Sequence, residues 1–230
     1  MVIGLGLFWL ENENIHMAAR MFQNDATALE TSGNANTTTA TATAASPVPQ
    51  LASVAPSAEL TIRMAGDIML DRHVRLYGSR YGYDSLFASI TPLFAGADIS
   101  VANLEGTITS NASETLLPNG QTTKSFVFTF ATGTAPVLAR AGISLVSLAN
   151  NHADGYGLAG IRETEKWLAA AGVGYFGDPW NSSTTEAVIT KNGITVAFVG
   201  YHAFQSGFDR VISAVKRLSA DGDFVVVMPH

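Results

Sequence analysis

The chain has 230 residues, of which 47% are hydrophobic and 14% charged, a composition that excludes a disordered, charge-rich protein and predicts a buried core. Its formal net charge is -6, which excludes a general nucleic-acid binder, because such proteins attract phosphates with an excess of Lys and Arg. Cysteine is absent, so disulfide scaffolds, thiol nucleophiles and thiolate zinc sites are excluded, and any metal must be bound through oxygen and imidazole.

Residues 1–30 open with an apolar run over residues 2–10. This run is shorter than the roughly 20 residues that a membrane-spanning helix needs, and no Lys or Arg precedes it as in a signal peptide. Two interpretations remain open: the remnant of a longer N-terminal membrane anchor, or an N-terminal helix over residues 15–29 that packs on nothing. The first would attach the protein to a membrane and place its domain outside the cytoplasm.

Residues 31–58 contain no charged side chain and are dominated by Thr, Ala, Ser and Pro. Such a segment buries too little apolar surface to offset the conformational entropy that is lost on ordering. We therefore expect a disordered linker, of the kind that holds a domain at a cell surface. The folded domain is expected over residues 59–230.

From residue 59 onward, apolar runs of strand length alternate with amphipathic segments of helical period. The sequence predicts strands at 60–65, 99–104, 143–148, 195–200 and 224–228. It predicts helices between Asp84 and Gly96, at 134–141, at 158–171 and at 208–218. Alternation at this spacing predicts an α/β fold with a mostly parallel sheet and flanking helices. Residues 107–132 break the order, and a turn signal at 118–120 with alternating Phe residues predicts a hairpin or an insertion over the functional site.

Polar residues follow the predicted strands at their carboxyl ends. They are Asp67, Asn103, Glu105, Asn150, Asn151, His152 and His230. Because the carboxyl ends of parallel strands meet at one edge of a sheet, these side chains should gather in one small volume. A cluster of Asp, Glu, Asn and His suits a hard or borderline divalent cation such as Mn, Fe, Zn or Mg. Each residue taken alone also suits a turn or a helix cap, so the prediction rests on their convergence.

Five segments resemble those of a known family. They are Gly66-Asp67-Ile68-Met69-Leu70, Asn103-Leu104-Glu105, the block Ser147-Leu148-Ala149-Asn150-Asn151-His152-Ala153-Asp154-Gly155-Tyr156-Gly157, Gly200-Tyr201 and Met228-Pro229-His230. With them, residues 59–230 resemble the capsule synthesis protein CapA family, the poly-gamma-glutamate capsule proteins whose domain is similar to calcineurin-like metallophosphatases. The resemblance implies a metallophosphatase-like sandwich that continues beyond residue 230, so that this chain would be truncated at its C-terminus.

The resemblance also implies roles for single residues in a site with two divalent metal ions. It assigns metal ligation to Asp67, Glu105, Asn151 and His230, and proton donation to His152. We further assign substrate contacts to Asn103, Asn150 and His202. The chain departs from the phosphatase pattern Asp-x-His at Ile68-Met69, so one imidazole ligand is missing. His73 is an alternative ligand, although a His beside Asp and Arg also suits a solvated surface.

The implied function is capsule biosynthesis outside the cytoplasm by a metal-dependent hydrolase that acts on a phosphoester or an amide-linked polymer. An alternative from another class is a non-catalytic partner in assembly, export or anchoring of an anionic polymer such as poly-gamma-glutamate. In that case a bound cation would bridge the polymer carboxylates, because the acidic chain lacks a basic surface to attract them. A third interpretation is an interaction domain that has kept the fold and lost its ligands.

Overall fold

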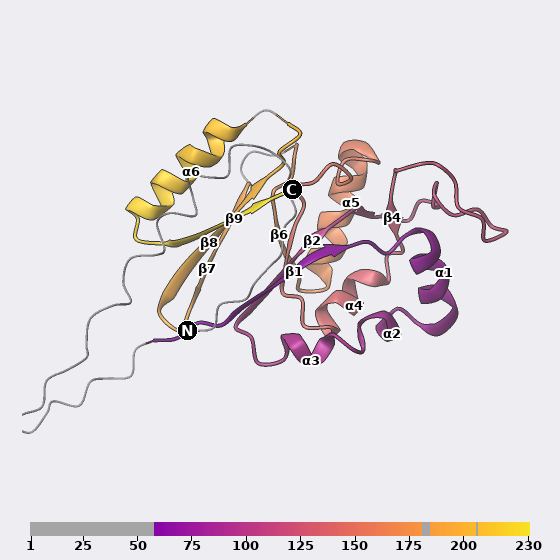
Figure 1. Ribbon diagram of the computed structural model, residues 1–230, viewed down its shortest axis with the longest axis horizontal. Coiled ribbons are helices and arrows are strands. Elements are labelled where there is room, and N and C mark those ends of the chain that lie inside the picture. The colour runs from indigo at the N-terminus through magenta and orange to yellow at the C-terminus, as the bar shows by residue number, and fades with distance from the viewer. Residues whose placement is uncertain (1–57, 181–184, 206) are drawn as a thin grey trace, which may run out of the picture. The chain divides into compact units, whose positions relative to one another are not determined.

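The computed structural model of the chain describes residues 58–180, 185–205 and 207–230. The predicted anchor remnant at 1–30, and the predicted linker at 31–58 except for its last residue, lie outside the described residues. Within the described part, no helix combines the length and the apolar character that a membrane crossing requires. The domain contains two main sheets, a small two-stranded one, and helices (Figure 1).

The first sheet has four parallel strands in the order β1-β2-β5-β6. They are β1 (Ile62–Ile68), β2 (Ile99–Leu104), β5 (Leu145–Ser147) and β6 (Gly174–Phe176). β2 is buried along its whole length, because the sheet is covered on both faces. Three of these strands confirm sequence predictions, whereas β6 is too short to show an apolar run.

The second sheet has three strands in the order β7-β8-β9, which are β7 (Glu186–Lys191), β8 (Ile194–Tyr201) and β9 (Phe224–Pro229). β8 and β9 pair in parallel and are joined by the helix α6 (Phe208–Ala220), as predicted. β7 pairs antiparallel with β8 through the turn Asn192-Gly193. Both turn residues have positive φ, 55° and 76°, the conformation that a tight hairpin requires.

Five further helices are assigned among the described residues: α1 (Arg72–Tyr81), α2 (Asp84–Phe87), α3 (Thr91–Phe94), α4 (Thr134–Arg140) and α5 (Gly157–Ala170). α4, α5 and α6 confirm sequence predictions, and α1 has no counterpart among them. The single helix expected between Asp84 and Gly96 is wrong, because it is divided into α2 and α3. Pro92, in the first turn of α3, has no N–H with which to continue the hydrogen bonding of a preceding turn.

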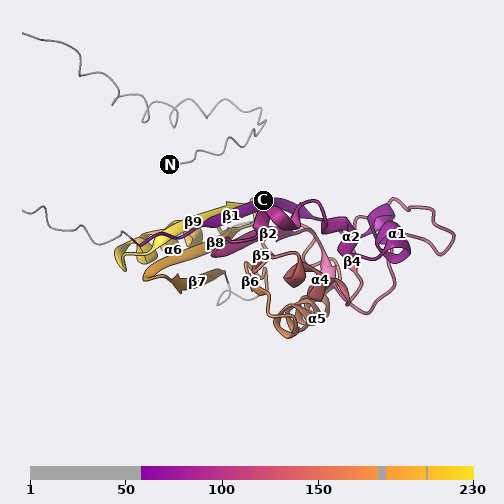
Figure 2. The ribbon, with the colours of Figure 1, turned by 90° about the horizontal axis from the view of Figure 1, so that it is seen from below.

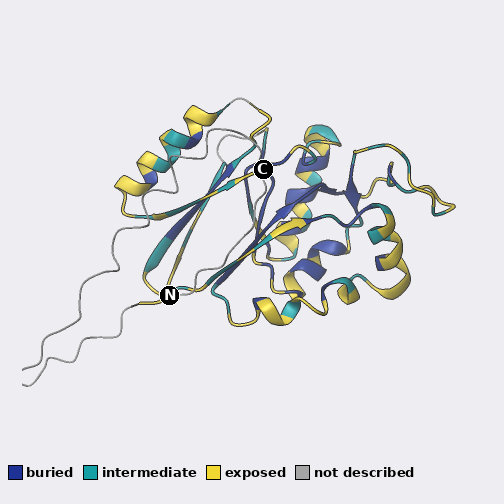
Figure 3. Cartoon of the chain, viewed as in Figure 1, coloured by how far each residue is buried: buried dark blue, intermediate teal, exposed yellow. Residues whose placement is uncertain are grey.

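Alternate side chains of each strand point to opposite faces of its sheet and pack into different apolar clusters. The domain therefore has four layers. Val101 of the first sheet and Phe198 of the second lie in the cluster between the sheets. Leu104 faces the other way and shares a cluster with Leu168 of α5, whereas the outer face of the second sheet packs on Leu218 of α6. The order is therefore helix, sheet, sheet, helix, and α6 and α5 lie on opposite sides of the sheets in Figure 1 and far from each other in Figure 2. Of the strands between them, β2, β5 and β8 are largely buried, whereas β1, β7 and β9 are mostly half-buried or exposed, and the outward helix faces are exposed (Figure 3). The predicted α/β class, with mostly parallel strands and flanking helices, is confirmed.

Residues 107–132 form the predicted insertion, but the alternative prediction of a single hairpin is wrong. β3 (Thr107–Ile108) and β4 (Thr129–Phe130) pair in parallel, so the chain between them loops back rather than turning once. The predicted turn at 118–120 is confirmed. It joins only one antiparallel bridge, between Leu116 and Thr122, rather than two strands.

Candidate metal centre

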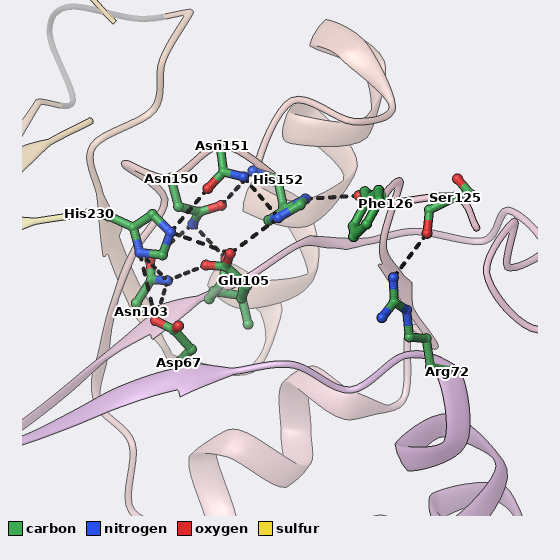
Figure 4. Close-up of polar contacts among 11 residues, drawn as sticks. Asp67, Arg72, Asn103, Glu105, Ser125, Phe126, Asn150, Asn151, His152 and His230 are labelled. Atoms are coloured by element: carbon green, nitrogen blue, oxygen red, sulfur yellow. Dashed lines mark hydrogen bonds and ion pairs between the residues drawn. The ribbon is translucent and has the colours of Figure 1, made fainter. Parts of the chain in front are cut away.

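Three side chains that can ligate a metal ion converge at the carboxyl ends of three strands (Figure 4). Asp67 is the penultimate residue of β1, Glu105 directly follows β2, and His230 directly follows β9. One ligand atom from each lies within 4.8 Å of the others. Asp67 is exposed, His230 is partly buried and Glu105 is buried, so the cluster opens to solvent on the Asp67 side.

Strand register brings the two carboxylates together. Parallel pairing of β1 with β2 sets Asp67 opposite Asn103, after an irregularity in β1 between Met64 and Asp67 that shifts the register. Glu105 lies one residue past the end of β2, and its backbone N–H donates to the carbonyl of Ile68 at 3.0 Å. Both carboxylates are therefore fixed by the backbone ladder of the first sheet.

His230 reaches the same edge from the second sheet. Its backbone N–H donates to the carbonyl of Tyr201, the last residue of β8, at 2.9 Å, and its own carbonyl accepts from the N–H of Ala203 at 2.9 Å. These two bonds continue the pairing of β8 with β9 beyond the strands. The imidazole then lies with Nε2 3.3 Å from Glu105 Oε1 and Nδ1 3.7 Å from Asp67 Oδ1.

The side-chain amide of Asn103 lies among these three residues. Its Nδ2 donates to Asp67 Oδ1 at 2.8 Å and to Glu105 Oε2 at 2.6 Å, and it lies 3.3 Å from His230 Nδ1. The two hydrogens of Nδ2 thus serve the two carboxylates, and the role of His230 Nδ1 depends on its tautomer. Two carboxylates with one imidazole are ligands that divalent ions bind at about 2.0–2.6 Å. The donor set therefore fits one divalent ion.

Asn150 links the loop after β5 to this cluster. Its Nδ2 donates to Asn103 Oδ1 at 2.9 Å and to the carbonyl of Leu104 at 2.8 Å, while its Oδ1 accepts from the backbone N–H of His152 at 3.0 Å. The two backbone partners fix which side-chain atom is oxygen and which is nitrogen, and Asn150 then fixes Asn103 in the same way. Asn150 is 1% exposed, and its predicted substrate contact, like that of Asn103, stays a prediction.

The imidazole of His152 is oriented by a backbone carbonyl. Its Nδ1 lies 2.8 Å from the carbonyl oxygen of Phe126, and because a carbonyl only accepts, the proton is on Nδ1. Nε2 faces the cluster, 2.9 Å from Asn151 Nδ2 and 3.4 Å from Glu105 Oε1. Asn151 in turn places its Oδ1 3.1 Å from Nε2 of His230. The predicted loop residues therefore lie beside Asp67, Glu105 and His230, and their roles as metal ligand and proton donor stay predictions.

The other two histidines considered in the sequence analysis, His202 and His73, do not belong to the group of Asp67, Glu105 and His230. His202 lies one residue beyond β8, and its ring packs edge-on against Phe204 at 5.8 Å. Burial lowers the pKa of His202 and nearby His230 lowers it further, so the neutral imidazole is favoured. Its Nδ1 is buried and has no hydrogen-bond partner among the described residues. His73 is exposed on α1 and does not belong to the group of metal-ligating residues.

The sequence interpretation missed the residues that support His152. Phe126 contributes only its carbonyl oxygen, which any residue could supply and which therefore leaves no sequence signal. The ring of Phe128 lies 4.5 Å from the imidazole, centre to centre. The alternation of Phe126, Phe128 and Phe130 is a signal that segment 125–130 is extended, but it does not indicate which neighbour it touches.

Comparisons with known proteins point to one family. Residues 61–230 match the family described as bacterial capsule synthesis protein PGA_cap. The chain is 30% identical over 168 residues to the capsule biosynthesis protein CapA of Bacillus anthracis, covering 70% of this chain and 40% of that protein. It is 27% identical over 145 residues to the PGA biosynthesis protein CapA of Bacillus subtilis (strain 168), covering 62% of this chain and 37% of that protein. The chain thus spans about two fifths of the length of these relatives.

Among solved structures, a hypothetical protein from Thermus thermophilus aligns with 74% of this chain and 57% of its own length. The TM-score of this alignment is 0.43, and the sequence identity is 18%.

Proposed function

The chain belongs to the family of bacterial capsule synthesis proteins, and from this premise we propose that its strand-end cluster is a metal-dependent hydrolytic site for capsule biosynthesis. The substrate is a phosphoester or an amide-linked anionic polymer such as poly-gamma-glutamate. The protein acts outside the cytoplasm and is held at a membrane by its first 30 residues. The observation that supports the hydrolytic site best is the convergence of Asp67, Glu105 and His230 within 4.8 Å.

These three residues would hold the metal ion. When bound there, a divalent ion supplies Lewis-acid polarisation of a phosphoryl or carbonyl oxygen and activation of water. Asn103 orients the two carboxylates through its amide N–H groups, and Asn150 holds Asn103 in that orientation. The acidic chain does not itself attract an anionic substrate, so the cation also supplies the attraction.

His152 is the proton donor of the proposed reaction. Its Nδ1–H is held by the Phe126 carbonyl, so Nε2, which points to the cluster, is the atom that takes up and releases the second proton. In the reaction, Nε2–H delivers its proton to the leaving oxygen or nitrogen of the substrate, while Glu105 at 3.4 Å stabilises the imidazolium.

Hydrolysis of bis(p-nitrophenyl) phosphate and of oligo-gamma-glutamate by the full chain, with Mn²⁺ or with EDTA, tests the proposal. We expect metal-dependent turnover of one of the two probes. The double variant Asn151→Ala/His152→Ala should abolish it, whereas His73→Ala, an exposed histidine outside the cluster, is the matched control and should leave it unchanged. Metal-dependent turnover that survives in the double variant contradicts the assignment.

A second candidate function is cation-bridged binding of an anionic polymer without hydrolysis. One observation favours it: the cluster of described residues offers three ligand side chains, enough for one ion, and Met69 stands where a further imidazole is expected. The predicted two-metal site would need Asn151 and substrate as additional ligands. Calorimetry with oligo-gamma-glutamate separates the candidates, because binding that requires the cation but produces no shorter chains supports the second function. Binding that EDTA does not change indicates a plain binding domain without a metal role.

A further inference from the structure

Arg72, at the start of α1, holds the backbone segment 125–128 (Figure 4). Its Nη2 donates to the carbonyl of Ser125 at 3.2 Å. The carbon of its guanidinium lies 5.2 Å from the ring centre of Phe126 and 5.0 Å from that of Phe128. A guanidinium at this distance is attracted to aromatic faces, so Arg72 binds the segment through one hydrogen bond and two rings.

The same segment holds His152 through different groups. Phe126 offers its ring to Arg72 and its carbonyl to Nδ1 of His152, at 2.8 Å. Phe128 packs on Arg72 and also lies 4.5 Å from the imidazole, centre to centre. Any shift of the segment away from Arg72 would therefore move the carbonyl and the ring that orient His152.

We infer that Arg72 is a positioning residue for His152. By holding segment 125–128, it keeps the Phe126 carbonyl where it selects the Nδ1–H tautomer of the neutral imidazole and leaves Nε2 facing the cluster. This inference rests on the proposed function, because it matters for catalysis only if His152 donates its proton from Nε2. Arg72 itself lies outside the cluster and acts only through Phe126 and Phe128.

Two energetically unfavourable features of Arg72 support this role. Its φ is 54°, in the left-handed region that residues with a side chain rarely adopt, and its buried Nε has no hydrogen-bond partner within the described part of the chain. Asp71 holds the backbone in that conformation, since its fully buried carboxylate accepts from the N–H groups of Arg72 at 2.9 Å and Thr129 at 3.0 Å. Strain of this kind persists where surrounding contacts over-determine a position, and it concentrates near functional sites.

Arg75 offers a matched control one turn further along α1. Its Nη1 donates to the carbonyl of Thr129 at 2.7 Å, one residue beyond Phe128. Replacing Arg75 therefore removes a charge, a long side chain and an anchor of the insertion without removing the stacking on the two Phe rings. A variant at this position reports on general loosening of the insertion.

The tautomer of His152 is the direct test, measured by ¹⁵N NMR of histidine-labelled chain at one fixed pH near 8. In the wild type and in Arg75→Ala, we expect the Nδ1–H form to dominate. In Arg72→Ala, we expect the Nε2–H form that free imidazole side chains prefer in water. Arg72→Lys keeps the charge but loses the planar, two-faced stack, so it should restore the Nδ1–H form only in part.

Kinetics with the probe that the wild type hydrolyses give a second readout. Arg72→Ala should lower kcat about tenfold and change KM less than twofold, because a misdirected proton donor affects the chemical step more than binding. A wild type that hydrolyses neither probe contradicts the proposed function, yet the tautomer comparison still decides whether Arg72 positions His152. An Nδ1–H form that is absent from the wild type, or unchanged in Arg72→Ala, overturns the inference.

Phe126→Ala keeps the test decisive if Arg72→Ala fails to fold. The Phe126 side chain is 65% exposed, so its removal should leave the fold intact. The variant keeps the carbonyl that bonds His152 but removes one of the two rings on which Arg72 lies. A partial change toward the Nε2–H form is expected, because the Ser125 bond and the Phe128 contact of Arg72 remain, and an unchanged tautomer would again overturn the inference.

Discussion

Asn150 donates a hydrogen bond of 2.9 Å from its Nδ2 to the side-chain oxygen of Asn103. This bond joins the loop after β5 to the end of β2, and it turns the amide nitrogen of Asn103 toward Asp67 and Glu105. The two carboxylates are thus oriented by the buried side-chain amides of Asn103 and Asn150.

Asn150→Ala should lower the free energy of unfolding by about 2–4 kcal/mol, because it leaves the Leu104 carbonyl and the His152 N–H without their buried partner. Urea denaturation followed by circular dichroism measures this change. Asn151→Ala is the matched control, since Asn151 is exposed, and it should cost less than about 0.5 kcal/mol. Equal losses in the two variants would show that the buried amide pair does not hold the loop.

Asn103→Ala should weaken Mn²⁺ binding about 10- to 100-fold in calorimetric titration, because residues that orient metal ligands contribute to affinity on that scale. The variant keeps all three proposed ligands but removes the donor that faces them. Gln121→Ala, which removes an exposed amide in the insertion, serves as the control. An affinity within twofold of wild type in Asn103→Ala would argue against an orienting role.

Gly200→Ala should destabilise the domain by about 1–3 kcal/mol, because a Cβ there would lie 2.8 Å from the Cβ of Ala149 and 2.9 Å from the Cα of Gly177. The change would press on the residue before Asn150, so metal affinity should fall as well. Gly66→Ala is the control, since its Cβ would meet nothing within 4 Å although Gly66 adjoins Asp67. Thermal melts of the two variants should therefore differ, and similar melts would contradict the packing.

His202 should make the domain less stable as the pH falls below about 6.5, because burial and His230 lower its pKa in the folded state. The unfolded chain then binds the proton more readily, so the stability that the neutral imidazole allows is present at pH 7 and declines as the pH falls from the unfolded pKa toward the folded one. Chemical denaturation in EDTA at several pH values measures this slope. His202→Gln should flatten it, and an identical slope in wild type and variant would refute the assignment to His202.

The α/β class, most of the main strands and the convergence of Asp67, Glu105 and His230 could be predicted from the sequence, for a simple physical reason. The strands β1, β2, β5, β8 and β9 are apolar runs that end in polar residues, and parallel strands deliver their carboxyl ends to one edge. Asp67, Glu105 and His230 therefore follow from local pattern plus topology. The Asn192-Gly193 turn of β7 and β8 is also a readable signal, although β7 has no counterpart among the predicted strands.

The parts that sequence did not reveal depend on contacts between distant segments. α1 is polar on average, largely exposed and interrupted by Gly78, so its sequence gives only a weak helical signal. The parallel pairing of β3 with β4 depends on how a loop of the insertion packs, which the alternating Phe residues do not specify. The Phe126 carbonyl and the stacking of Arg72 leave no pattern at all, because one is a backbone atom and the other a contact across the fold.

The metal content of the chain tests the central claim most directly. Purified chain is dialysed against Mn²⁺, freed of unbound ions and analysed by inductively coupled plasma mass spectrometry, beside the variants Asp67→Asn and Glu105→Gln and the control His73→Ala. We predict about one ion per chain in the wild type and in the control, and strong loss in the two carboxylate variants. A wild type without bound metal, or carboxylate variants that bind it as well as the wild type, would contradict a metal centre at Asp67, Glu105 and His230.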